Sequence, residues 1–455
     1  MEFIGREEEL ARLGYMAESD APGCVIIAGR PGSGKSALIR EFCSRRRSVY
    51  IRRDKESFLG EFFHVKKDGS VKEVRGTIPE LVKAAISFSK PAIVLAVDAK
   101  AKYIYDEAAR HSLIEFDEKC TESMIILSQQ SAVNHVEWNR IGSSTPRGTC
   151  RATLGPMSPG EFSKLLPPMS DHDAIRAYLM LGGLPGRSRM VTSDTFNGFL
   201  EGCVSDGRIE TAVNSFCRRE NMDRPEKDML KVVCLVGEAP LQEIMRASRH
   251  LGWADRAAMI DKLCRAGLME VVRKGTDAPL YRPTEPMAVF RWRVLSKCPD
   301  APGPRPAAAR LAPEIGAFMR PEFTKLSAGL LSGYGMKVSR KDVPPGFEFV
   351  LGSGPDRVIV RCDIRGEELG KKSVESAAFS AVVAGGCPMI VSASGFDADA
   401  EDTADELGVT LIGPDQILGR KPLPAIVRSG TAMGHRTMCD MAFSSVCEGE
   451  EVLDW

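Results

Sequence analysis

The sequence predicts an α/β protein of several domains, the first of which contains a parallel sheet covered by helices on both faces. Over residues 1–160, apolar runs of strand length alternate with helical stretches, a pattern typical of parallel strands that are buried on both sides. A second α/β pattern follows at residues 311–420. The chain has 455 residues, which predicts three or four domains of ordinary size.

Composition excludes several classes of protein. Lys+Arg and Asp+Glu both number 61, so the whole chain lacks the basic excess of a dedicated nucleic-acid binder. The 13 cysteines form no C-x-x-C pair, which argues against a disulfide framework or a zinc knuckle and favours reduced thiols in a cytoplasmic protein. The first residues, MEFIGREEEL, do not read as a signal peptide, and no apolar run approaches the ~18 residues of a membrane span. We therefore expect no membrane contact.

The first domain, residues 1–160, is expected to hold five strands. They lie at 24–29, 48–53, 91–99, 123–130 and 151–157, with helical stretches between them. Residues 158–225 then look entirely helical. Ser158 is a plausible N-cap followed by Pro159 at the first helical position, and a later helix is expected to stop at Gly182, Gly183 and Pro185. We expect residues 161–225 to form a helical lid on the first domain.

Residues 226–297 show the order of a winged helix-turn-helix, with three helices followed by a pair of strands. Cations occur on the third helix and the wing, at residues 254–275, and would neutralise DNA phosphates: Arg256, Lys262, Arg265, Arg273 and Lys274. Asp255 and Asp261 share that helix. Contact with DNA and a role in protein packing are therefore equally compatible with this region.

The remainder of the chain divides at a stretch rich in proline and alanine. Residues 298–310 read as a linker. A helix, a hairpin, a helix, a strand, a helix and a short strand are expected in turn at 311–420. Residues 421–455 show no clear period and are expected to form a tail, part of it disordered.

The clearest chemical motif is GRPGSGKS at residues 29–36, which matches G-x-x-x-x-G-K-[ST] and lies between a predicted strand and a predicted helix. Glycines let main-chain N–H groups approach phosphate oxygens, and the helix N-terminus adds partial positive charge. Lys35 would reach the β- and γ-phosphates and Ser36 would ligate Mg²⁺. The residues expected to contact ATP here are Gly29, Pro31, Gly32, Ser33, Gly34, Lys35, Ser36 and Ala37.

A carboxylate directed at magnesium is expected at the end of a neighbouring strand. Asp98 closes AIVLAVD and is the candidate, although a strand-end aspartate can also cap a helix. The acidic residues of FDE at 116–118 are the competing candidates. We reject them because too few residues separate them from the next strand for a crossover helix. Ala99 follows Asp98, where hydrolysing enzymes of this class usually place a glutamate that orients water. We therefore expect slow hydrolysis or none, with Asp106 and Glu107 as distant substitutes.

With these motifs, the chain resembles the archaeal-type ATPases of the AAA-related, signal-transducing (STAND-like) P-loop class. FIGREEELARL resembles the family's opening motif, which implies that Ile4, Gly5 and Arg6 lie near the adenine. LGGLPG at 181–186 resembles its glycine-proline motif, which implies that Pro185 faces the nucleotide. The resemblance extends to four further residues. It implies that Gln129 and Gln130 form the polar phosphate sensor and that Arg147 is either an arginine contact or an ordinary surface arginine. It also places Glu285 where many members have aspartate.

The C-terminal pattern resembles the type IV subset of restriction-endonuclease-like domains. Active members combine a carboxylate at one strand with an acid-x-Lys tripeptide on the next, which together hold Mg²⁺ and activate water. Here the first acid is Glu348, but the tripeptide reads Arg361, Cys362 and Asp363. Two of the three catalytic positions differ, so the resemblance implies a nuclease fold without nuclease chemistry.

Three functions remain open from the sequence. The preferred one is an ATP- and Mg²⁺-binding switch that changes its contacts with DNA, with a protein partner or with further copies of itself. The second is an active ATP-driven DNA-processing enzyme with a cryptic nuclease site at Glu348 and Asp363. The third is a scaffold whose nucleotide is structural.

Overall fold

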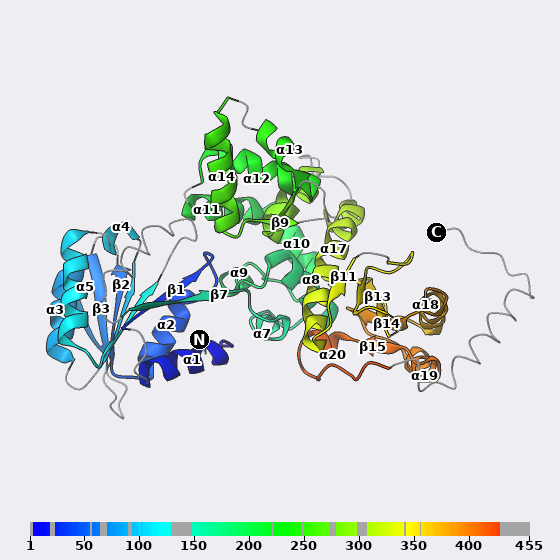
Figure 1. Cartoon of the computed structure of the whole chain (residues 1–455), viewed down its shortest axis with the longest axis horizontal. Coiled ribbons are helices and arrows are strands. Elements are labelled where there is room, and N and C mark those ends of the chain that lie inside the picture. Colours follow the sequence, from blue (N-terminus) through cyan, green and yellow to red (C-terminus); the bar gives the residue numbers. More distant parts are fainter. Residues whose placement is uncertain are drawn as a thin grey trace, which may run out of the picture. The chain divides into compact units, whose positions relative to one another are not determined.

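The structure is a computed structural model. It describes residues 3–18, 23–54, 57–63, 71–89, 93–99, 101–104, 106–128, 148–220, 222–247, 250–272, 279–297, 307–340, 343–354 and 356–427 (Figure 1). The chain divides into two compact units. The first unit contains residues 1–157, 182–190 and 206–293, and the second contains 158–181, 191–205 and 294–455. Each unit is therefore assembled from separate stretches of sequence.

A seven-stranded sheet forms the centre of the first unit. Its order is β4-β3-β2-β5-β6-β1-β7. The strands β2, β5, β6, β1 and β7 run parallel, whereas β3 and β4 are antiparallel at one edge. Their bounds are β1 Cys24–Gly29, β2 Ser48–Asp54, β3 Ser57–Phe63, β4 Val71–Gly76, β5 Val94–Asp98, β6 Met124–Ser128 and β7 Thr149–Leu154. The predicted parallel strands are present, and the edge hairpin is an addition that the sequence analysis did not predict.

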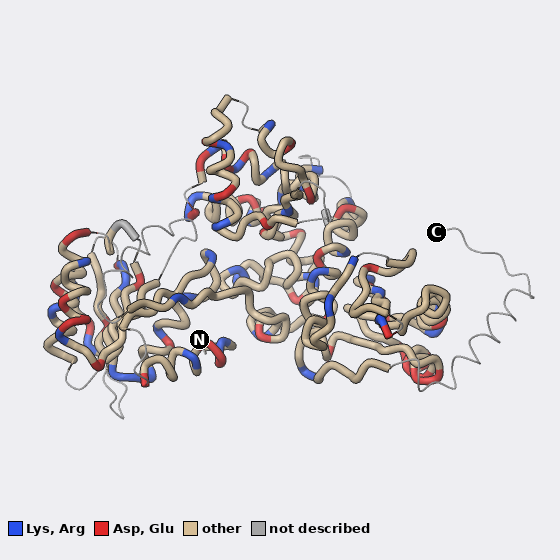
Figure 2. The backbone as a smooth tube through the Cα atoms, in the orientation of Figure 1, with Lys and Arg blue, Asp and Glu red and all other residues tan. Residues whose placement is uncertain are grey.

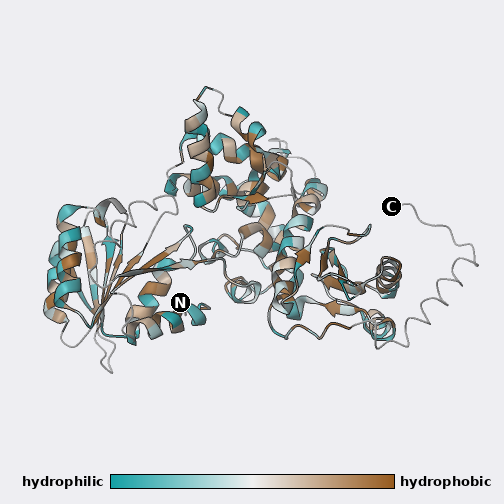
Figure 3. Cartoon of the chain, in the orientation of Figure 1, coloured by the Kyte–Doolittle hydropathy of each residue, from teal (hydrophilic) through white to brown (hydrophobic). Residues whose placement is uncertain are grey.

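Helices cover both faces of this sheet, because alternate side chains of each buried strand point to opposite sides. On one face, α3 (Ile78–Phe88) and α5 (Glu107–Lys119) pack on a cluster that includes Leu95 and Val97 of β5. On the other, α1 (Glu7–Glu18) and α2 (Lys35–Ser44) pack on a cluster that includes Ala96 of the same strand. The apolar character of these strands is visible in Figure 3. The short helix α4 (Ala101–Ile104) precedes α5.

The remainder of the first unit is mainly helical and carries a three-stranded antiparallel sheet of order β8-β10-β9. The three helices predicted at 226–290, of which the second was expected to be short, and the strand pair are present. The elements are α9 Pro185–Ser188, α11 Arg208–Arg219, α12 Arg224–Val236, β8 Ala239–Pro240, α13 Leu241–Arg246, α14 Trp253–Arg265, β9 Met269–Val272, β10 Leu280–Pro283 and α15 Pro286–Val289, followed by a π-helical turn at Phe290–Val294.

The second unit combines helices with a five-stranded sheet of order β11-β12-β13-β14-β15. The predicted hairpin is β12 with β13, and β13, β14 and β15 run parallel. The strands are β11 Val338–Ser339, β12 Phe349–Leu351, β13 Val358–Asp363, β14 Cys387–Ser392 and β15 Thr410–Ile412. The helices are α7 Pro159–Ser163, α8 Asp171–Leu181, α10 Phe196–Ser205, α16 Ala307–Arg310, α17 Ala312–Leu331, α18 Lys371–Val383, α19 Ala398–Leu407 and α20 Pro414–Ile417, with 3-10 turns at Leu295–Lys297 and Ser332–Tyr334.

The helix boundaries follow local chemistry. Ser158 caps α7, and its side chain and that of Glu161 form a reciprocal capping box, as the sequence predicted for the start of this helix. Gly182 and Gly183 follow α8 with φ of 69° and 63°, values that favour glycine. Pro185 plays a different part from the one predicted, because it begins α9 instead of helping to stop α8. Within the described residues, no helix is both long and apolar enough to cross a membrane.

Candidate nucleotide-binding site

The loop between β1 and α2 has the backbone geometry that its sequence predicts. Gly32 and Gly34 have φ of 88° and 90°, conformations that a residue with a Cβ adopts only with strain. Gly34 is also the N-cap residue of α2 and forms no side-chain cap. The first N–H groups of this ten-residue helix therefore have no capping side chain. Such a helix start suits an anionic group.

Lys35 lies at the first position of α2 and is only 7% exposed. Its Nζ donates to the carbonyl oxygens of Gly29 at 2.6 Å and Arg30 at 2.9 Å. Burial lowers the pKa of Lys35 to about 8, although the charges of Glu220 and Asp98 act in the opposite direction. The ammonium group is thus held by the loop's own carbonyl oxygens, in a site that disfavours its charge. A phosphate group would be a stronger partner for it.

The two candidate magnesium-directed groups come from different elements. Ser36 is exposed in the first turn of α2, whereas Asp98 is buried at the end of β5. The hydroxyl of Tyr50 on β2 donates to Asp98 Oδ2 at 3.0 Å, which orients that carboxylate. Burial, followed by the negative charge of Asp98, raises the pKa of Tyr50. The hydroxyl and carboxylate oxygens are donors of the kind that Mg²⁺ prefers, so these residues fit the ion chemically. Ala99, which follows Asp98, is fully buried.

The opening segment lies against the loop. Arg6 has φ of 65°, which is unusual for a residue other than glycine. Its guanidinium donates to the carbonyl oxygens of Ser33 at 3.3 Å and Gly155 at 2.5 Å, and to Glu9 at 2.6 Å. Gly5, which precedes it, is buried and also has a positive φ. The structure therefore brings Arg6 to the phosphate loop, with Gly5 beside it in sequence.

The glycine-proline segment contacts the loop directly. The N–H of Gly186 donates to the carbonyl oxygen of Gly32 at 2.9 Å. A Cβ on Gly186 would lie 2.9 Å from the Cα of Gly32, and a Cβ on Gly34 would lie 3.2 Å from the ring of Pro185. A Cβ at position 186 would therefore clash with the loop backbone, and one at position 34 would press on Pro185, which accounts for the glycines at these two positions.

A buried carboxylate connects the loop to two other segments. Glu285 is 1% exposed. Its oxygens accept from Arg30 of the loop at 3.3 Å and from Arg187 of α9 at 2.5 Å. Arg30 also donates to the carbonyl oxygen of Thr284 at 3.1 Å, to its hydroxyl at 2.8 Å and to the carbonyl oxygen of Gly267. Burial opposes ionisation of Glu285, but the two arginines outweigh it and hold its pKa below the usual value. We call Arg30, Arg187, Gly267, Thr284 and Glu285 the Glu285 cluster.

Sequence reasoning missed two residues of this region. Glu220, which follows α11, is fully buried and acts on Lys35 more strongly than Asp98 does. Ser128 ends β6 next to β1, and its buried hydroxyl has no hydrogen-bond partner among the described residues. Neither residue belongs to a recognisable motif. Gln129, Gln130 and Arg147, which the family resemblance singled out, lie outside the described residues.

The basic residues of α14 have partners within the first unit. Lys262 pairs with Glu226 at 2.5 Å, Arg265 pairs with Asp261 at 2.5 Å, and Arg256 donates to the carbonyl oxygen of Met245 at 3.0 Å. Figure 2 shows that residues of both charge signs occupy this helix. Arg273 and Lys274 of the predicted wing lie outside the described residues. The described cations of residues 254–275 are therefore engaged in intramolecular contacts.

In the second unit, the structure brings the candidate nuclease positions together. The N–H of Glu348 donates to Val360, and continuing the β12–β13 register places Arg361 opposite Glu348. Glu348 Oε2 accepts from the N–H of Cys362 at 2.7 Å. Asp363 accepts from Arg365 through both oxygens, at 3.1 and 2.9 Å. Burial raises the pKa of Glu348. Both carboxylates thus have cationic or N–H partners within the protein. The described residues contain no group of three or more His, Cys, Asp or Glu side chains that could hold a metal ion.

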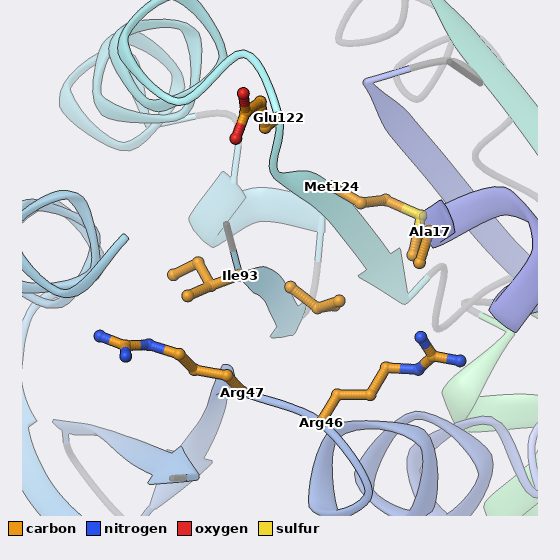
Figure 4. A pocket seen from close by; sticks show the side chains of 7 residues that line it. Ala17, Arg46, Arg47, Ile93, Glu122 and Met124 are labelled. Atoms are coloured by element: carbon orange, nitrogen blue, oxygen red, sulfur yellow. The ribbon is translucent and has the colours of Figure 1, made fainter. Parts of the chain in front are cut away.

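A separate small hollow in the first unit lies where β5 and β6 begin, at the end of the sheet away from the phosphate loop. Its lining includes Arg46, Arg47 and Glu122 (Figure 4). The two arginine side chains point in opposite directions. Arg46 pairs with Glu18 at 3.0 Å, and Arg47 donates to the carbonyl oxygen of Phe88 at 2.7 Å. They do not converge on one point, so this hollow lacks the arrangement of an anion site.

Comparisons with known proteins agree with this geometry at the N-terminus. Residues 2–86 match the model of the AAA ATPase domain family. The match covers α1, the phosphate loop and most of α3. No curated protein sequence matches the chain. The chain thus contains an AAA ATPase-type segment at its start, on a mixed α/β sheet that is rich in parallel strands.

Several solved structures are similar in part. The Walker-type ATPase PABY2304 of Pyrococcus abyssi is 14% identical, with a TM-score of 0.45, over 63% of this chain and 95% of that one. The Aeropyrum pernix Orc1 protein in complex with DNA is 15% identical, with a TM-score of 0.30, over 68% and 95%. A RuvB variant of Thermotoga maritima is 17% identical, with a TM-score of 0.31, over 64% and 95%. At these scores the likenesses carry no argument about function.

Proposed function

We propose that this protein binds ATP with Mg²⁺ and acts as a nucleotide-dependent switch. The observation that carries the proposal is the loop at residues 29–36, in which left-handed glycines precede an uncapped helix N-terminus and a buried lysine. Main-chain N–H groups at such a helix start attract phosphate oxygens. Lys35 would bind the β- and γ-phosphates, and Ser36 with Asp98 would hold the ion. The match of residues 2–86 to the AAA ATPase domain supports this assignment.

We further propose that hydrolysis is weak or absent. Phosphoryl transfer depends on a group that orients the attacking water. The residue after Asp98 is Ala99, which is fully buried and has no group that orients water. The roles proposed for Gln129 as sensor and Arg147 as a phosphate contact rest on the family resemblance. ATP would then act as a conformational ligand whose presence changes the contacts of the protein.

The architecture that we propose follows the sequence boundaries. It comprises an ATPase core at 1–160, a helical lid at 161–225, a winged helix at 226–297, a linker at 298–310, a restriction-endonuclease-like domain at 311–420 and a tail at 421–455. The pairing of Asp363 with Arg365 and the contact of Glu348 with Cys362 support a C-terminal domain without nuclease activity. Lys262 and Arg265 already pair with carboxylates of the same region, which weakens the case for binding to DNA through residues 254–275.

A titration tests the proposal. Calorimetry with Mg²⁺ and ATP should show binding by the wild-type protein and none by Lys35→Ala, because the substitution removes the cation that faces the phosphates. Lys83→Ala is the matched control, since Lys83 is an exposed lysine on α3, and it should bind as the wild type does. Phosphate release by the wild type should stay near background. Absence of heat with the wild-type protein would refute ATP binding, and rapid turnover would refute the proposed role of Ala99.

A further inference from the structure

A closed series of contacts joins the phosphate loop to the segments at 182–190 and 267–285. Arg30 contacts Glu285, which contacts Arg187 of α9. The residue before Arg187 is Gly186, whose N–H returns to the loop at Gly32. The partners in this series are separated by up to 255 positions in sequence. Each contact lies within the first compact unit.

Lys35 is connected to the same series through the main chain of Arg30. Its Nζ donates to the carbonyl oxygen of Arg30, while the guanidinium of that same arginine donates to Gly267, Thr284 and Glu285. A phosphate that draws the Lys35 ammonium away from this carbonyl oxygen removes a hydrogen bond that fixes the backbone of Arg30. Lys35 and the partners of the Arg30 side chain are therefore linked through a single residue.

We propose that the Glu285 cluster is a latch that transmits occupancy of the phosphate loop to residues 267–272 and 279–289. The inference rests on the proposed binding of ATP. In the latched state, Arg30 holds this segment through three residues. When phosphates engage Lys35, Arg30 releases Gly267, Thr284 and Glu285, and residues 267–272 and 279–289 loosen.

The burial of Glu285 makes the latch sensitive to this release. A buried carboxylate that loses one of two cationic partners keeps an uncompensated part of its charge, which is strongly unfavourable. The Glu285 side chain is 1% exposed, whereas that of Arg30 is 23% exposed. Arg30 can therefore reach water when it leaves, but Glu285 can be rehydrated only if its segment moves. Release of Arg30 thus favours movement of the segment that carries Glu285.

Hydrogen exchange tests the latch on the whole chain. MgATP should speed amide exchange at residues 266–272 and 279–289 of the wild type by about five- to 150-fold, the usual range of coupling between sites. In Arg30→Gln, calorimetry should still show binding, but exchange at these residues should be fast from the start and unchanged by MgATP. Arg30→Lys, which keeps the charge but lacks the planar fork, should behave in the same way.

The chain offers a matched control. Glu61 is another fully buried carboxylate shared by two arginines, Arg40 and Arg52, and Arg52→Gln should leave the MgATP response intact. The latch is refuted if the wild type binds MgATP without faster exchange at 266–272 and 279–289, or if both Arg30 variants keep the full response. In either case ATP binding would stand. A wild type that gives no heat with MgATP would instead refute the proposed function, and the latch with it.

Discussion

At the scale of single residues, the lysine of the phosphate loop combines two opposing requirements. Its charge is needed for phosphate, but the site around it is mostly closed to water. Lys35 is 7% exposed, and burial lowers its pKa from 10.5 to about 8. The folded state binds this proton less well than the unfolded state. Burial of Lys35 therefore lowers the free energy of unfolding, and this loss is complete below pH 8. That loss disappears as the pH rises toward 10.5.

The same shift predicts a pH dependence of nucleotide binding. Phosphates favour the charged lysine, so binding above pH 8 must take up a proton at Lys35. We expect affinity for ATP in the absence of divalent cations to be nearly constant at about pH 6.5–7.5. Above about pH 8 it should fall by up to tenfold per pH unit. Calorimetry in two buffers of different ionisation enthalpy would detect the proton uptake. An affinity that stays constant to about pH 9.5 would contradict the prediction.

The residues of the site differ in how far the sequence predicts them. The loop residues are contiguous and lie between a strand and a helix, so one short motif identifies them. Glu285 acts through contacts with Arg30 and Arg187, which lie 255 and 98 positions away. Glu220 likewise reaches Lys35 only through the fold. No periodicity or spacing encodes such contacts, so they require the structure.

At the scale of elements, the central strands β1, β5 and β6 were predicted because they are buried along their whole length and therefore read as continuous apolar runs. The edge hairpin was missed for a physical reason. β4 is mostly exposed and therefore lacks an apolar pattern. β3 contains Glu61, whose charge interrupts the apolar run although its side chain is fully buried between Arg40 and Arg52. An edge strand and a strand with a buried ion pair both escape a search for apolar runs.

The crossing of α9 over the phosphate loop gives a prediction at this scale. Substitution of Gly186 by alanine would place a Cβ 2.9 Å from the Cα of Gly32, so one of the two backbones must shift. We expect Gly186→Ala to lower the free energy of unfolding by about 1–3 kcal/mol. It should also weaken ATP binding, because the loop is displaced. Denaturant unfolding and calorimetry would measure the two effects.

Gly329→Ala is the control for this substitution. Gly329 lies in α17 with open space around its Cα, so alanine should raise stability by about 0.5–1 kcal/mol and leave ATP binding unchanged. If Gly186→Ala matched the wild type in both stability and affinity, the close approach of α9 to the loop would not describe the protein in solution.

At the scale of the whole molecule, sequence order and compact units do not coincide. The second unit takes α8 and α10 from the middle of the chain and joins them to elements after residue 294. Within that unit, α8 packs on α17, and His172 near its start lies 3.1 Å from the carbonyl oxygen of Ile364. The sequence analysis grouped α8 with the segments that precede and follow it in the chain. Its contact with α17 is a tertiary contact, which the order of the sequence does not reveal.

This assembly predicts the behaviour of a shortened chain. A protein ending at residue 297 keeps α8 but loses α17, on which α8 packs, so part of the buried apolar surface of α8 becomes exposed. Exposure of a large apolar side chain costs about 1.5–3 kcal/mol. We expect this chain to bind an apolar dye and to self-associate in size-exclusion chromatography. A chain ending at residue 427 keeps every described element and should elute as the full chain does. A monodisperse, dye-free product ending at 297 would show that α8 does not depend on α17 for its packing.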